Sequence, residues 1–190
     1  TMITKKDIEE LFATQLEKIS DPALRTQVVD VWVTACEKSK YRSVDDLRKM
    51  PFTLLTDCQG VNFIEHTIAV TEGAIGLAKA QLDTFAKMAY TIDMDRLVAG
   101  GLLHDVGKVL EIEPDGSGGY RKSRNGMCAR HPISGAILAG EAGVSDEIVN
   151  TIACHAKEGD GRPKVVETIL IHQADFATFD PFVMLQKGHL

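Results

Sequence analysis

Histidine and aspartate side chains at widely separated positions of this chain have the chemistry of metal ligands. A histidine and an aspartate are adjacent at His104-Asp105, directly after a pair of leucines. Neutral imidazoles and ionised carboxylates together suit transition metals. In chain order the candidate ligands are His66, His104, Asp105, His131, His155 and Asp175. The set predicts a metal site, although any single buried histidine is more often a hydrogen-bonded core residue.

The first histidine is expected to point inward from a helix over residues 62–82. His66 shares one face of that helix with Phe63, Val70 and Leu77. An imidazole buried on such a face needs either a hydrogen-bond acceptor or a metal ion. The spacing therefore indicates that His66 points into the core.

The His104-Asp105 pair ends a helix that Asp93 or Asp95 can cap. Adjacent helical residues point about 100° apart, so both can bind one ion only if it lies between them. The two oxygens of Asp105 can also bridge two ions, as in two-metal sites, where the ions lie about 3.5–4 Å apart. Lys108 falls on the same side of the helix as Asp105 and is suited to a substrate phosphate. We predict catalytic roles for Asp105 and Lys108, with a solvated helix end as the alternative for Lys108.

Two later helices are expected to carry the next two histidines. His131 and Pro132 begin one of them, because proline suits a first helical turn. Ser145 caps the next, in which Ile152 and His155 share an inward face. The pattern predicts that both histidines lie at helix ends beside the core.

Asp175 is expected on the inner face of a last core helix over residues 164–176. It follows Ile171 by one helical turn. A buried aspartate without a cation would be costly, which favours metal binding. His172 lies three residues before Asp175 and is a candidate supporting partner.

A basic cluster lies in the segment 113–130, which reads as the longest loop. It contains Arg121, Lys122 and Arg124 between two ligand-bearing segments. Such cations can bind an anionic substrate, and we predict substrate contacts from all three and from Lys108. A simple solvated loop is the alternative.

The first 55 residues contain none of the candidate ligands and read as a helical layer. Thr4 and Asp7 have capping-box spacing, Asp21-Pro22 opens a second helix, and Ser43 begins a third. We expect residues 1–55 to serve in packing or in formation of a homodimer. Alternating strand patterns are absent, so an all-α fold is predicted.

Composition is that of an ordinary globular protein, with 44% hydrophobic residues and a net charge of −6. Because acidic residues outnumber basic ones, we expect no polymeric nucleic acid as a partner, only a small anionic substrate. Apolar runs of membrane-spanning length and a signal-peptide core are absent, which favours the cytoplasm and no membrane contact. The four cysteines lack CxxC spacing and read as reduced core thiols.

The ligand order resembles the HD-domain metal-dependent phosphohydrolase superfamily, in its two-metal pattern H…HD…H…H…D, over residues 60–180. The resemblance implies a helical HD domain, assigned here to residues 56–190. It implies a first metal held by His66, His104, Asp105 and Asp175, and a second held by His131, His155 and Asp105. It also implies iron or manganese, and a bridging water that attacks phosphorus of a phosphomonoester or phosphodiester in a nucleotide or another small anionic substrate.

Other readings of the same site stay open. Residues 154–163 resemble a segment of the HD-GYP cyclic-dinucleotide phosphodiesterases but lack its paired histidine and its Gly-Tyr-Pro. The spacing from His131 to Asp175 is closer to bacterial HD hydrolases of dinucleoside tetraphosphates. Di-iron oxygenases on similar helices, hydrolysis of a carbon electrophile and a non-catalytic binding module with a structural metal are the alternatives of other classes.

Overall fold

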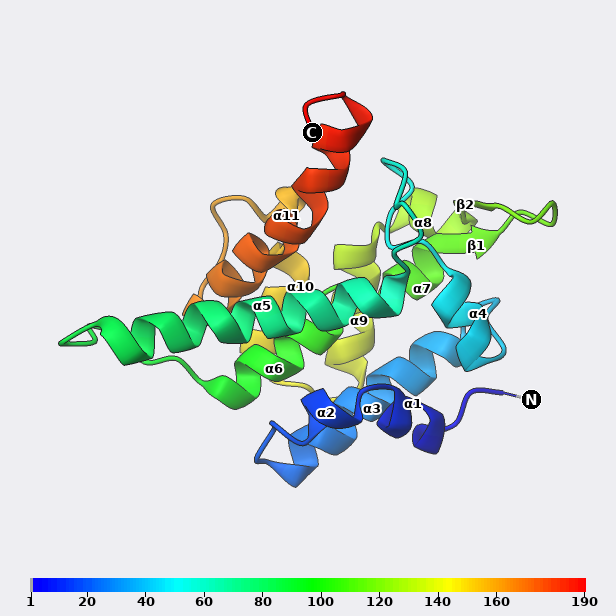
Figure 1. Cartoon of the computed structure of the whole chain (residues 1–190). Coiled ribbons are helices and arrows are strands. Elements are labelled where there is room, and N and C mark those ends of the chain that lie inside the picture. Colours follow the sequence, from blue (N-terminus) through cyan, green and yellow to red (C-terminus); the bar gives the residue numbers. More distant parts are fainter. Residues whose placement is uncertain (1) are drawn as a thin grey trace.

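Helices make up nearly all of the regular structure in the computed structural model, which describes residues 2–190 (Figure 1). The predicted all-α class with an N-terminal helical extension is confirmed. The N-terminal helices are α1 (Lys5–Leu11), α2 (Ala13–Leu16), α3 (Pro22–Glu37) and α4 (Val44–Lys49). The later helices are α5 (Phe63–Thr84), α6 (Met94–Leu103), α7 (Lys108–Glu111), α8 (Arg124–Cys128), α9 (His131–Glu141), α10 (Asp146–Cys154), the 3-10 helix η1 (Lys157–Gly159) and α11 (Val166–Gln186).

Most helix starts follow from local sequence. The predicted capping box of Thr4 and Asp7 is present, as is a second one that begins at Ser43. Asp21 caps α3, and Asp93 rather than Asp95 caps α6. Each cap satisfies a backbone N–H that would otherwise lack a partner at a helix start. At α10 the cap position is Ser145 as predicted, but its side chain accepts no capping hydrogen bond.

The segment 113–130 is not a plain loop, contrary to the prediction. A hairpin of β1 (Ile112–Pro114) and β2 (Tyr120–Lys122) begins at its edge, and α8 follows. Strands of three residues are too short for alternation to reveal them in the sequence. The predicted end of the last helix is also too early, because α11 continues to Gln186 with Pro181 inside it.

The N-terminal helices are tied to the ligand-bearing helices through a buried indole. Trp32 of α3 donates a hydrogen bond from Nε1 to the backbone oxygen of Leu102 in α6, at 3.0 Å. Its ring packs against Phe12 and Phe63, with centroids 4.9 and 5.6 Å away. Aromatic packing of this kind adds to the burial of apolar surface. The extension therefore shares one hydrophobic core with the rest of the chain.

Helices α5, α6 and α11 pack together at the centre, and α9 and α10 pack beside them (Figure 1). After α6, the chain turns through residues 104–107 before α7 begins. Gly107 makes this turn fit against α9, because a Cβ atom there would lie only 2.2 Å from the backbone oxygen of His131. The absent side chain allows His131 to approach Asp105 closely.

Candidate metal centre

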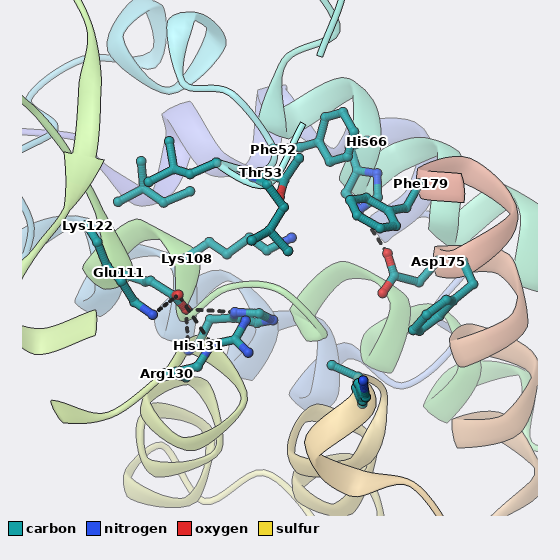
Figure 2. A pocket seen from close by; sticks show the side chains of 16 residues that line it. Phe52, Thr53, His66, Lys108, Glu111, Lys122, Arg130, His131, Asp175 and Phe179 are labelled. Atoms are coloured by element: carbon teal, nitrogen blue, oxygen red, sulfur yellow. Dashed lines mark hydrogen bonds and ion pairs between the residues drawn. The ribbon is translucent and has the colours of Figure 1, made fainter. Parts of the chain in front are cut away.

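The six predicted ligands come together from five parts of the fold. His66 lies on α5, His131 begins α9, and Asp175 lies on α11, while the others follow the ends of α6 and α10. Figure 2 shows His66 and Asp175 on one side of a pocket and His131 on the other. Their ligand atoms form two groups that share Asp105, and within each group all atoms lie within 4.8 Å of one another. The groups are His66, His104, Asp105 and Asp175, and Asp105, His131 and His155.

Asp105 lies between the two groups, with one carboxylate oxygen facing each. Its Oδ2 is 3.4 Å from Nε2 of His66 and 3.3 Å from Nε2 of His104. Its Oδ1 is 3.2 Å from Nε2 of His131 and 3.3 Å from Nε2 of His155. A carboxylate in this position can bridge two cations.

Several of these buried atoms have no hydrogen bond among the described residues. They are Nε2 of His66, His104 and His155, and Oδ1 of Asp105. Each unsatisfied buried polar atom costs about 1–3 kcal/mol. The other ring nitrogens of two of the histidines are satisfied, since Nδ1 of His104 contacts the oxygen of Gly101 at 2.6 Å and Nδ1 of His155 contacts that of Ile152 at 2.8 Å. These contacts place the ring proton on Nδ1 and leave Nε2 free to coordinate, so the residues fit a metal cluster.

Both candidate carboxylate ligands are held in the charged form. Burial alone would raise the pKa of Asp105, but the positive charge of Lys108 holds it well below its usual value. For Asp175, burial is opposed by the close contact with His66, and the pKa falls to about 2. Anionic carboxylates are the form that binds metal.

His66 is held in place by Phe52 and by Asp175. The ring of Phe52 stacks on its imidazole at a centroid distance of 4.4 Å. Nε2 of His66 also lies 3.1 Å from Oδ1 of Asp175.

His172, expected as a partner of Asp175, instead contacts the backbone oxygen of His155 through Nδ1 at 2.6 Å.

The pocket over the ligands has a volume of about 400 Å³ and carries an excess of positive charge. Among its described lining residues, four cations face two carboxylates. The cations are Lys108, Lys122, Arg130 and Lys157, and the carboxylates are Glu111 and Asp175. This local excess in an acidic chain suits an anionic ligand.

Only part of the predicted basic cluster lies at this pocket. Lys108 reaches it, with Nζ 2.5 Å from Oδ2 of Asp105, and so does Lys122. Arg121 extends from the hairpin, where it pairs with Glu113 at 2.9 Å, and Arg124 is exposed at the start of α8. Arg121 and Arg124 are outside the described lining of the pocket.

Glu111 contacts the candidate site and was not predicted from the sequence. Its Oε2 accepts hydrogen bonds from the backbone nitrogen and from Nδ1 of His131, at 2.6 and 2.7 Å. Its Oε1 lies 3.3 Å from Nζ of Lys122 and 3.5 Å from Nε of Arg130. Burial opposes its charge, but the His131 hydrogen bond lowers its pKa to about 2. The one signal in the sequence was its position three residues after Lys108.

Replacing Glu111 with glutamine is expected to weaken binding of the ion next to His131 by about 10- to 100-fold. Glutamine keeps the shape but loses the charge that orients the imidazole and faces Lys122 and Arg130. Calorimetric titration of metal-free protein with Mn²⁺ would measure the change. Glu113→Gln is the matched control, because its carboxylate pairs with Arg121 outside the pocket. Equal affinities in the two variants would contradict this role.

Comparisons with known proteins identify the family of this chain. The HD domain family matches residues 63–177. Ribonuclease Y of Pseudothermotoga lettingae is 34% identical over 116 residues, and that of Desulforudis audaxviator is 34% identical over 116 residues. These alignments cover 61% of this chain, and the chain spans only 18% of each relative. No solved structure matches the chain.

The expectation that polymeric nucleic acid is excluded as a partner is wrong. The relatives are named as ribonucleases, and RNA is a polymeric nucleic acid. The error came from the net charge of the whole chain, which does not describe the locally cationic pocket.

Within the described residues, each helix is too short or too polar to cross a membrane.

Proposed function

This chain belongs to the HD domain family of metal-dependent phosphohydrolases, and we propose that it hydrolyses phosphodiester bonds in a nucleotide-containing substrate. The observation that carries the proposal is the position of Asp105 between two ligand groups that both reach a cationic pocket. The candidate ligands that line this pocket are His66, His131 and Asp175. The names of the relatives support a phosphodiester over a phosphomonoester, and RNA as one source of it. An uncharged substrate for oxygenase chemistry would have no use for four pocket cations.

We assign one ion to His66, His104, Asp105 and Asp175, and a second to Asp105, His131 and His155. Iron and manganese both suit mixed imidazole and carboxylate ligands. When bound, such ions make water acidic enough to act as the nucleophile near neutral pH and polarise the phosphoryl oxygens. The chain itself orients the imidazoles through the backbone oxygens of the α6 and α10 ends and through Glu111.

Cationic side chains would hold the anionic substrate over the ligands. Lys108 is close enough to Asp105 to share the phosphate with a metal held there. Lys122 and Arg130 add positive charge at the side of the pocket where Glu111 lies (Figure 2). Arg121 and Arg124 remain proposed contacts, now with phosphates outside the pocket. Charge-assisted hydrogen bonds of this type are the strong ones in phosphate recognition.

Protein reconstituted with iron or manganese is expected to hold two ions per chain and to hydrolyse phosphodiesters. Two ligand groups with one shared carboxylate predict this stoichiometry. Elemental analysis of anaerobically reconstituted protein would count the ions. A screen of short RNA, dinucleotides and bis(p-nitrophenyl) phosphate would measure hydrolysis.

Metal-free protein treated with chelator is the control for that screen. One ion per chain would reduce the site to a mononuclear centre. Two bound ions without hydrolysis of any phosphoester would overturn the proposed function and shift it to a carbon electrophile.

A further inference from the structure

Large apolar side chains line the same pocket that contains the cations. Two of them keep much of their surface in water, with Leu54 42% exposed and Leu55 73% exposed. Phe176 and Phe179 of α11 are half-buried. A ligand with an apolar part would remove this surface from water, which is favourable. We define the apolar lining as Phe52, Leu54, Leu55, Ile112, Phe176 and Phe179.

Most of the apolar lining comes from parts of the chain outside the family match. Phe52, Leu54 and Leu55 precede residue 63, and Phe179 follows residue 177. The metal-ligating candidates all lie inside the matched range. Four of the six residues of the apolar lining therefore lie outside the matched range, in the N-terminal extension and in the continuation of α11.

Aromatic and cationic side chains occupy different sides of the pocket. Figure 2 shows Phe52 and Phe179 beside His66 and Asp175, with Lys122 and Arg130 across the pocket. The Phe52 and Phe179 rings meet edge to face, with centroids 6.4 Å apart. Lys108 lies between the two sides (Figure 2). Phe52 is itself buried and stacked on His66, so the aromatic surface open to a ligand comes from the half-buried Phe176 and Phe179. A ligand with a phosphate at the centre therefore has this surface in one direction and further positive charge in the other.

Building on the proposed function, we propose that the apolar lining binds the nucleobase of the nucleotide whose phosphate lies at the metal centre. Every base has a flat π face that can stack on aromatic side chains without regard to sequence. The pocket volume of about 400 Å³ falls within the range of small-ligand sites, about 300–1,000 Å³. A base paired in a duplex has no free face, so the subsite selects unpaired nucleotides.

Calorimetric titration of manganese-loaded protein with three product analogues tests this subsite without requiring turnover. The ligands are adenosine 5′-phosphate, ribose 5-phosphate and inorganic phosphate. The adenine should tighten binding over ribose 5-phosphate by about 5- to 150-fold, the usual range for stacking one base. Ribose 5-phosphate and phosphate should bind with similar affinity, because neither carries a base.

Phe176→Ala and Leu55→Ala should each reduce the factor by which adenosine 5′-phosphate binds more tightly than ribose 5-phosphate. Neither substitution should change the affinity for inorganic phosphate. Phe85→Ala is the matched control, because Phe85 is 51% exposed beyond the end of α5 and outside the pocket lining. The proposed base subsite would be wrong if adenosine 5′-phosphate and ribose 5-phosphate bound with equal affinity. It would also be wrong if both lining variants kept the parent's ratio of these two affinities. Neither result would contradict the proposed function. A loaded protein that binds no inorganic phosphate would overturn the proposed function as well.

Discussion

Asp105→Ala is expected to lose most of its bound metal, and its rate of phosphodiester hydrolysis should fall by roughly 1,000-fold or more. A fall of this size corresponds to the loss of several kcal/mol of transition-state stabilisation by metal. The reason is geometric, since Asp105 contributes an oxygen to each ligand group. Its loss also leaves Lys108 without the carboxylate that lies 2.5 Å from its Nζ. Elemental analysis and steady-state kinetics on the same preparation would measure both effects.

Asp105→Asn separates the loss of charge from the loss of volume, and it should show nearly the same defect. Asp180→Asn is the control, because Asp180 is an exposed carboxylate on the same helix as Asp175. Circular dichroism would establish that each variant is folded. Normal ion content and turnover in Asp105→Asn would contradict the bridging role.

Lys108→Ala is expected to lower kcat/KM for phosphodiesters by about 10- to 150-fold, equivalent to the 1.5–3 kcal/mol of a hydrogen bond to a charged group. Lys108 lies at the pocket beside Asp105 and is only 12% exposed, so water screens its charge poorly. Metal content should stay near that of the parent, which distinguishes this variant from those at Asp105. Kinetics on a dinucleotide, with ion content measured in parallel, would test it.

Lys87→Ala is the matched control for Lys108, because Lys87 is an exposed cation in the connection that follows α5. The control should behave as the parent protein does. If Lys108→Ala hydrolysed phosphodiesters as well as Lys87→Ala, Lys108 would have no role in substrate binding, and an uncharged substrate would become the better hypothesis.

Local rules account for the parts of this protein that could be predicted from the sequence. The caps at Thr4, Asp21 and Ser43 are each set by a few neighbouring residues. The inward direction of His66 follows from the period of its own helix, since Phe63 and Val70 on the same face are buried. The helical class could be anticipated for the same reason, whereas the grouping of the six candidate ligands was expected from the resemblance of their order to the HD superfamily. The division of the chain at residue 55 stays a prediction.

Tertiary structure decided whatever depends on residues that are distant in sequence. Glu111 contacts His131 across 20 positions, and no periodic pattern joins them. Phe52 and Phe179 meet at the pocket although they lie far apart in the sequence. The fold also determined the local charge of the pocket, because folding brings four cations together around it. The net charge of −6 is a sum over all residues and does not show this. Helix periodicity orients a side chain toward the core, but only packing determines which other side chains it meets there.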